Sequence, residues 1–205
     1  MGFYSNVIFP RVLDWVMARG VLAEYRQRVL SDAEGEVLEI GFGTGANLPH
    51  YPPHIHKITT VEPNLGMNAV AQKRIKASSI VVENRALRAE ALSMPDNSFD
   101  TVVSTMTMCS IADLNQALRE IHRVLKPGGR LLFLEHGLSS DPKVQAWQHR
   151  LTPVTKLLGD GCHLNRNIQR YVETLPFRIF TSKQFYLEGT PKVGGYMYQG
   201  VAAKD

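Results

Sequence analysis

The amino-acid sequence predicts an α/β fold with a parallel sheet covered by helices on both faces, and three observations support this prediction. Short apolar runs alternate with stretches of helical periodicity between residues 36 and 136. One apolar run ends in three closely spaced glycines, and a Pro-Gly-Gly turn follows the most regular helical stretch. Strands joined through helices pair in parallel with right-handed crossovers, and this arrangement buries both faces of the sheet.

The predicted strands and the helix between the last two of them follow from apolar periodicity. The helix is expected over residues 112–125, because its apolar residues recur on one face; Asp113 opens it and Pro127 follows it. The strand-like runs are 36–40, 58–61, 80–82, 101–104 and 131–134.

The C-terminal third departs from this alternation. Residues 143–158 and 167–174 have helical patterns, and the chain is expected to break between them at Gly159, Asp160 and Gly161. Residues 177–187 and 196–203 then alternate in the manner of strands, which predicts a closing β-hairpin.

The N-terminal arm, residues 1–30, is predicted to contain a loop, a helix from about residue 10 and a break near Gly20. Two interpretations of this arm stay open. Its apolar stripe either packs over the sheet, or its aromatic residues form a lid over a ligand or a surface that meets lipid. Those aromatic residues are Phe3, Tyr4, Phe9 and Trp15.

Composition indicates one soluble globular domain over residues 1–205, with 44% hydrophobic and 20% charged residues. The net charge is +4, but Lys and Arg form no run, so we expect no nucleic-acid partner. Cys109 and Cys162 have neither a disulfide framework nor metal-ligand spacing, which predicts a reduced, cytoplasmic protein without a metal site. Arg11, Asp14 and Arg19 interrupt the N-terminal apolar residues, so a signal peptide or membrane span is not expected.

The most informative motif is the glycine loop at Gly41, Gly43 and Gly45, which follows the first predicted strand. Glycine allows positive φ angles and close approach of a ligand to the backbone, so such a turn after a parallel strand suits a nucleotide. Glu62 ends the second predicted strand, where its two carboxylate oxygens can accept hydrogen bonds from ribose hydroxyls.

With Glu39 ahead of the glycines, the E-x-G-x-G-T-G pattern resembles the first motif of class I S-adenosylmethionine-dependent methyltransferases. The run from Ala89 to Asp100 is similar to the A-E-x-L-P-x-x-D-x-S-F-D run of the methyltransferase type 11 family. This resemblance implies a Rossmann-like, seven-stranded, mostly parallel sheet with an antiparallel C-terminal hairpin. It implies a cofactor-binding core over residues 36–136 and acceptor-side helices in 137–205. The cofactor would be S-adenosylmethionine, held by Glu39, Gly41, Gly43, Thr44, Gly45, Asn47, Glu62, Pro63, Asn64, Ala89, Glu90, Ala91, Thr105 and Met106.

Two further motifs, F-x-E-H ending at His136 and D-G-C-x-L-x-R from Asp160 to Arg166, resemble those of small alkyl-thiol methyltransferases. Candidate catalytic residues are His136, Asp160 and Cys162, although each also has an ordinary structural interpretation as packing, a turn or a sheet-edge hydrogen bond. Methyl transfer from a sulfonium needs chiefly alignment of the acceptor, and it needs a base only if the acceptor must lose a proton.

The predicted function is therefore methyl transfer to a small lipophilic acceptor, such as a thiol or a quinol. Residues 104–109 lack the Asn/Asp-Pro-Pro-Tyr motif of enzymes that methylate base amines. Peripheral membrane contact through the arm and a monomeric or homodimeric state are expected. A nicotinamide-dependent oxidoreductase, disfavoured by the position of the third glycine, and a non-catalytic binding module remain the alternatives.

Overall fold

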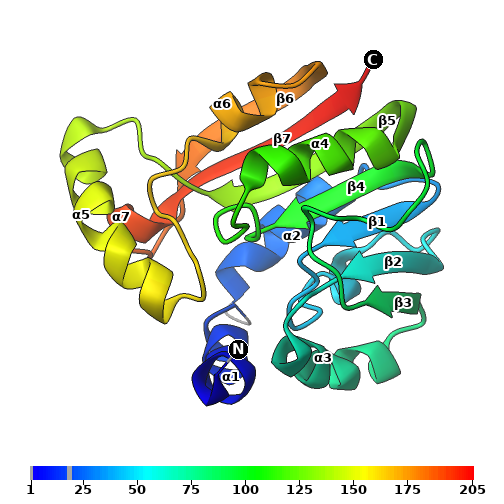
Figure 1. The fold of residues 1–205 in the computed structure, drawn as a ribbon, viewed down its shortest axis with the longest axis horizontal. Helices are drawn as coiled ribbons and strands as arrows, with labels where there is room; N and C mark the ends of the chain where they lie inside the picture. Colours follow the sequence, from blue (N-terminus) through cyan, green and yellow to red (C-terminus); the bar gives the residue numbers. More distant parts are fainter. Residues whose placement is uncertain (1, 18–19) are drawn as a thin grey trace.

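The computed structural model describes residues 2–17 and 20–205, and its centre is a seven-stranded sheet in the order β3-β2-β1-β4-β5-β7-β6 (Figure 1). Strands β1 to β5 pair in parallel, and β7 runs antiparallel to both β5 and β6. The mostly parallel sheet with a closing antiparallel hairpin is thus confirmed. Its strands are β1 (Val37–Ile40), β2 (Lys57–Val61), β3 (Val81–Arg85), β4 (Phe99–Thr105), β5 (Leu125–His136), β6 (Phe177–Tyr186) and β7 (Tyr196–Lys204).

Helices flank the sheet and also extend past one of its ends. Figure 1 shows α1 and α5 beyond the carboxyl ends of the central strands. The helices are α1 (Phe9–Met17), α2 (Ala23–Leu30), α3 (Leu65–Ala77), α4 (Leu114–Val124), α5 (Pro142–Leu158), α6 (Ile168–Glu173) and α7 (Lys192–Gly195). Short helical turns of other types are η1 (Tyr4–Ile8), η2 (Gly20–Leu22) and η3 (Leu48–His50).

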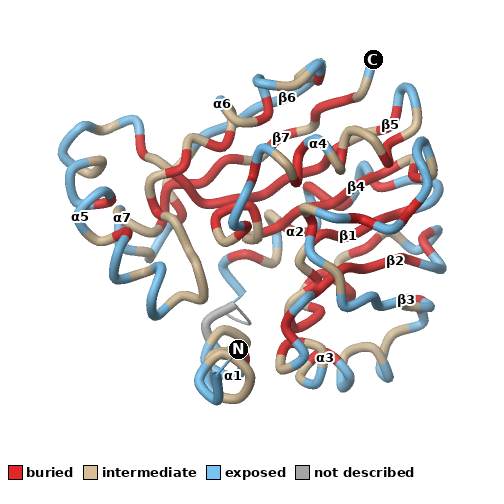
Figure 2. Tube along the Cα trace, in the orientation of Figure 1, coloured by how far each residue is buried: buried red, intermediate tan, exposed pale blue. Residues whose placement is uncertain are grey.

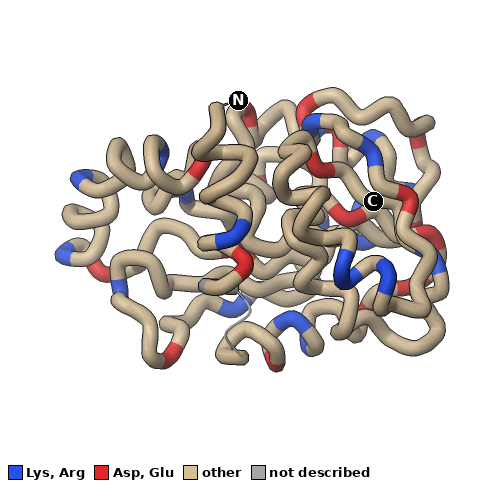
Figure 3. Tube along the Cα trace, turned by 90° about the horizontal axis from the view of Figure 1, so that it is seen from below, with Lys and Arg blue, Asp and Glu red and all other residues tan. Residues whose placement is uncertain are grey.

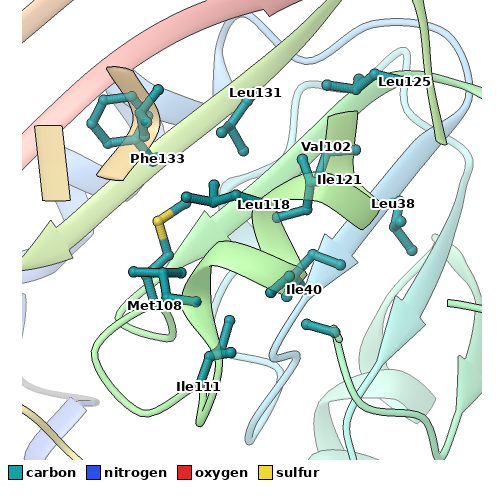
Figure 4. Close-up of a cluster of buried hydrophobic side chains, with 14 of the residues drawn as sticks. Leu38, Ile40, Val102, Met108, Ile111, Leu118, Ile121, Leu125, Leu131 and Phe133 are labelled. Carbon is teal, nitrogen blue, oxygen red and sulfur yellow. The ribbon is translucent and has the colours of Figure 1, made fainter. Parts of the chain in front are cut away.

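The chain buries two apolar clusters, one on each face of the sheet. Figure 2 shows that buried residues run along the central strands. On one face, α4 and α6 pack against the sheet, and Figure 4 shows Leu118 and Ile121 of α4 meeting Val102 and Leu131. On the other face, α2 and α3 cover β1, β2 and β5 through residues that include Leu30 and Ala71. The alternating apolar pattern therefore buries both faces, as parallel pairing requires.

The predicted loop before residue 10 is wrong, because η1 continues directly into α1. The N–H of Phe9 donates to the carbonyl of Tyr4, five residues back, and this wide turn leads into Pro10 without interrupting the helix. Gly66 lies directly under the arm, since a Cβ there would overlap the carbonyl of Asn6. The expected break near Gly20 falls partly on residues 18–19, outside the described residues, and Gly20 itself begins η2.

The turn between α4 and β5 also differs from its prediction. Helix α4 ends at Val124, and β5 begins at Leu125, which pairs with Phe99 of β4 before a register shift. The strand thus includes Pro127 and Gly128, the latter with a φ of 76°. An irregular strand edge tolerates a proline and a left-handed glycine, whereas a regular ladder does not.

The described helices include none with both the length and the apolar character needed to cross a bilayer. Figure 3 shows Lys and Arg interspersed with Asp and Glu rather than gathered on one segment. Neither the first α-helix, α1, nor the last, α7, carries a run of like charge in the sequence.

Candidate active site

A cavity of about 460 Å³ opens at the carboxyl ends of β1, β2 and β4, the position at which open α/β sheets bind ligands. Its volume lies within the range of roughly 300–1,000 Å³ that is usual for small-molecule sites. The glycine loop, the residues after β2 and β4, and the loop after α5 all line it. Phe9 and Leu13 of α1 also contribute to the wall.

The glycine loop has the backbone that the motif predicts. Gly41, Gly43 and Gly45 have φ angles of 68°, 55° and 75°, which side-chain-bearing residues rarely adopt. A Cβ on Gly41 would overlap Thr107, whereas a Cβ on Gly43 would meet only the carbonyl of Gly41, at 3.8 Å. The loop therefore packs tightly against the β4 end through Gly41 and leaves the space at Gly43 open for a ligand.

Glu62 lies at the end of β2 with its carboxylate held by two backbone donors. Its Oε2 accepts the N–H of Gly43 at 2.9 Å, and its Oε1 accepts the N–H of Asn64 at 2.9 Å. Burial raises the pKa of Glu62, while these two hydrogen bonds act in the opposite direction. Each oxygen still has lone-pair capacity for a ligand hydroxyl, so the carboxylate is oriented before a ribose arrives.

A buried polar network forms the floor of the cavity beneath the glycine loop. Asn47 donates to Glu39 at 2.9 Å, and Tyr51 donates to the other carboxylate oxygen at 2.8 Å. Arg26 of α2 donates to Asn47 at 2.6 Å and to Thr105 at 3.0 Å. Burial raises the pKa of Glu39 to about 7 against these hydrogen bonds. The network places the Glu39 carboxyl group and the Arg26 guanidinium on either side of Asn47 at the cavity.

Arg26 is a site residue that the sequence interpretation missed. It lies on the same helical face as Leu22, Val29 and Leu30, and all four are buried. A cation on an otherwise apolar helical stripe is the signal that could have identified it, because an unpaired buried charge is costly.

The structure brings most of the predicted cofactor residues to this cavity. Ala89 and Glu90 line it, and so does Arg88. Gly45 and Ala91 stand behind the lining: Gly45 packs near Phe42, and Ala91 closes a turn onto Arg88. The lining includes the other twelve predicted residues, Glu39, Gly41, Gly43, Thr44, Asn47, Glu62, Pro63, Asn64, Ala89, Glu90, Thr105 and Met106.

Two of the candidate catalytic residues, His136 and Cys162, meet across the cavity wall. The Sγ of Cys162 lies 3.2 Å from Nε2 of His136, and Cys109 joins them so that the three ligand-type atoms lie within 4.8 Å of one another. A hydrogen bond from Cys162 holds the pKa of Cys109 well below its usual value and raises the pKa of Cys162. Burial alone would lower the pKa of His136, but the neighbouring Cys109 raises it overall.

The third candidate, Asp160, lies apart from this cluster. It accepts hydrogen bonds from Ser5 of the arm at 3.2 Å and from Asn64 at 3.3 Å. Its φ of 49° is unusual for a non-glycine residue, and Asp tolerates it better than most. Asp160 therefore joins the arm, the β2 end and the loop after α5.

Glu135, the acidic residue of the F-x-E-H motif, has a definite structural role. Its carboxylate accepts the backbone N–H groups of Thr107 and Met108 and the hydroxyl of Ser104. Burial raises the pKa of Glu135 to about 8. These bonds hold the turn after β4, including Met106 with its φ of 56°, against the end of β5.

Fold, glycine loop and acidic strand end together define a class I methyltransferase-type nucleotide site. Residues 38–133 match the profile of the Methyltransf_11 family, described as a methyltransferase domain. Over these residues the chain is similar to the methyltransferase type 11 family, and this similarity implies S-adenosylmethionine as the cofactor. The residues fit that cofactor, because Gly43 leaves space against the backbone and Glu62 presents an oriented carboxylate.

Curated relatives agree with this assignment. Rat thiol S-methyltransferase TMT1B is 39% identical over 70% of this chain and 60% of its own length. Human thiol S-methyltransferase TMT1A is 36% identical over 69% of this chain and 59% of its own. The ubiquinone/menaquinone biosynthesis C-methyltransferase UbiE of Shewanella sediminis is 31% identical over 65% of this chain and 57% of its own length. The chain thus spans about 60% of the length of the thiol methyltransferases that it matches.

Solved structures match the fold over almost the whole chain. A SAM-dependent methyltransferase from Thermotoga maritima has a TM-score of 0.66 at 23% identity and covers 97% of this chain and 99% of its own. A geranyl diphosphate methyltransferase has a TM-score of 0.69 at 14% identity, and the match covers 91% of this chain and 77% of that protein. At such identities the likeness establishes the fold.

Proposed function

We propose that the protein transfers a methyl group from S-adenosylmethionine to a small lipophilic acceptor, with a thiol as the favoured class. The observation that carries this proposal is that one cavity joins the glycine-loop site to a wall of apolar and sulfur-bearing side chains. The similarity to thiol S-methyltransferases TMT1A and TMT1B supports a thiol, and the similarity to UbiE supports a quinol as the second candidate.

The cofactor's amino-acid end would lie over the buried polar network. Glu39 suits its ammonium group and Arg26 its carboxylate, because the two side chains offer opposite charges on one cavity floor. Glu62 would bind the ribose hydroxyls, and the backbone at Ala89 and Glu90 would lie against the adenine.

Acceptor binding is assigned to the opposite part of the cavity. Phe9, Leu13, Met106 and Ile111 line it and provide apolar surface for a small lipophilic molecule. When bound, the cofactor supplies an already activated methyl group, so the protein contributes chiefly alignment and exclusion of water. The predicted roles of His136 and Cys162 concern how an acceptor loses its proton.

The N-terminal arm is proposed as the lid of this site. It lies on α3 and on the loop after α5, with Tyr4 donating to the carbonyl of Leu158 at 2.6 Å. Phe3 and Trp15 are mostly exposed, which supports peripheral contact with a lipid surface. We expect a cytoplasmic protein, monomeric or dimeric, that does not bind nucleic acid.

Calorimetric titration with S-adenosylhomocysteine, followed by methyl-transfer assays on alkyl thiols, quinols and amines, tests the proposal. We expect micromolar binding and turnover of thiols. Binding of NAD in place of S-adenosylhomocysteine would favour an oxidoreductase. A protein that binds neither nucleotide would be a binding module, and turnover of amines alone would refute the acceptor class.

A further inference from the structure

Cys109, His136 and Cys162 form a cluster with the composition and spacing of a soft-metal site. The three ligand-type atoms lie within 4.8 Å of one another, and Sγ of Cys162 is 3.2 Å from Nε2 of His136. Zinc bonds of ~2.3 Å to sulfur and ~2.0 Å to nitrogen place tetrahedral ligands roughly 3.5 to 3.8 Å apart. Small side-chain shifts therefore suffice to bring all three atoms onto one ion.

Backbone contacts hold the segments that carry these ligands. The N–H of His163 donates to the carbonyl of Cys109 at 2.8 Å, which fastens the loop after α5 to the turn after β4. Arg166 donates to the carbonyl of Met108 next to it. His136 is the last residue of β5, so a strand end fixes the third ligand. The cluster is thus assembled by the fold from segments that lie far apart in the sequence.

All three residues line the same cavity as the glycine loop, and this determines what a metal there can do. A structural zinc site uses four protein ligands, whereas a catalytic site uses three and leaves one position for water or substrate. Within the described residues, His, Cys, Asp and Glu offer only this group of three at ligand spacing. The fourth position therefore faces the cavity.

We propose that Cys109, His136 and Cys162 bind one Zn²⁺ whose open position takes the acceptor thiol as a thiolate. This inference rests on the proposed function, because the cavity must hold S-adenosylmethionine for the thiolate to be methylated. The composition favours zinc, since two thiolates and one imidazole form a ligand set that zinc prefers over hard, oxygen-seeking cations.

The charges of the site agree with a bound zinc ion. Two thiolates balance the two positive charges of the ion, so the occupied cluster is neutral before the substrate arrives. A third thiolate adds one negative charge, and Arg166 lies close enough to interact electrostatically with both cysteines.

The reaction then proceeds without a protein base. The acceptor thiol loses its proton to solvent when its sulfur binds the zinc ion, because metal coordination deprotonates a thiol. The acceptor sulfur forms a bond to the methyl carbon as the bond between that carbon and the sulfonium sulfur breaks. The electron pair of the broken bond stays on the cofactor sulfur, which becomes neutral. The product thioether is a weaker ligand than a thiolate and leaves the metal.

Metal binding is tested on tag-free protein by elemental analysis and by substitution with Co²⁺. We expect about one equivalent of zinc per chain and, with cobalt, a thiolate-to-metal charge-transfer band. The chain has two cysteines, so C109S and C162S should each weaken that band. H149A is the matched control, because His149 is exposed and lies outside the cluster. Absence of the band in wild-type protein would overturn the site.

Function is tested on wild-type protein before and after removal of zinc with a chelator. We expect thiol methylation to fall at least tenfold and to return with added Zn²⁺, while S-adenosylhomocysteine still binds. Full thiol methylation by the metal-free protein would overturn the inference and leave the proposed function intact. Loss of S-adenosylhomocysteine binding in all samples would instead contradict the proposed function. A Cys109–Cys162 disulfide in the freshly isolated protein, detected by thiol titration, would also overturn the metal site.

Discussion

At the scale of single residues, the cofactor side of the site is fixed by hydrogen bonds that exist before any ligand binds. Glu62 holds the backbone of Gly43 with one oxygen and that of Asn64 with the other. A preoriented carboxylate loses little conformational entropy when it binds a ribose, so its contribution to affinity should be close to that of an ideal charged hydrogen bond.

We expect E62A to weaken S-adenosylhomocysteine binding by about 2 kcal/mol, or roughly thirtyfold. The substitution removes the ribose acceptor and leaves the N–H groups of Gly43 and Asn64 without their partner. Calorimetry measures the effect, with E83A as the control, because Glu83 pairs with Lys57 on exposed strand surface away from the cavity. Equal affinity in E62A and wild type would exclude Glu62 from the cofactor site.

Glu39 should make cofactor affinity depend on pH. Burial raises its pKa to about 7, so the free protein holds it mostly protonated below that pH. A cofactor ammonium favours the carboxylate, and binding should therefore tighten as the pH rises from 6 to 8, by about tenfold at most. The same raised pKa stabilises the folded state below about pH 4.5, and this stabilisation is lost as the pH rises through 7.

The measurement for Glu39 is calorimetric titration with S-adenosylmethionine in two buffers of different ionisation enthalpy, which counts the protons released. E39Q is the control, because any pH dependence left in that variant belongs to the cofactor itself. Identical pH profiles for wild type and E39Q would contradict the assignment of Glu39 to the ammonium.

The residues that could be predicted from sequence are those whose role follows from local backbone. Gly41 and Glu62 carry their signal in the spacing of a loop and the end of the next strand. Arg26 has only the weaker signal of a cation on an apolar helical stripe, and Cys109 has none, because their roles depend on partners that are distant in sequence. The cysteine spacing in the sequence does not reveal the cluster for the same reason, because the fold and not the spacing brings Cys109 to Cys162.

At the scale of elements, prediction succeeded where amphipathic periodicity decides the structure. Helix α4 buries Leu118, Ile121 and the other apolar positions of its stripe completely, and Asp113 caps it by accepting the N–H of Gln116. The η1 turn could not be predicted in this way. It is stabilised by tertiary contact with Gly66 and by the hydrogen bonds of Ser5, and local propensity describes neither.

L118A should lower the free energy of unfolding by about 3 kcal/mol, because the side chain is fully buried between α4 and the sheet. Urea denaturation measures the loss. N115A on the exposed face of the same helix is the control, with an expected change under about 0.5 kcal/mol. A loss below about 1 kcal/mol for L118A would mean that the face of α4 has been assigned incorrectly.

At the scale of the whole molecule, Arg74 of α3 connects the arm to the cofactor site. It pairs with Asp14 of α1 at 2.5 Å and donates to the carbonyl of Thr44 in the glycine loop at 2.9 Å. Asp160 supplies a second connection, between Ser5 and Asn64. Two sets of contacts therefore couple the position of the arm to the loop that holds the cofactor.

D14N should speed the release of S-adenosylhomocysteine about fivefold, because a partly buried ion pair contributes about 1 kcal/mol to holding the arm closed. Stopped-flow fluorescence can follow release, since the chain has two tryptophans and Trp15 lies on α1. K57Q breaks the exposed pair with Glu83 and should leave the release rate unchanged. Unchanged release from D14N would show that the arm stays closed without this ion pair and would assign its closure to the contacts of Ser5, Asn64 and Asp160.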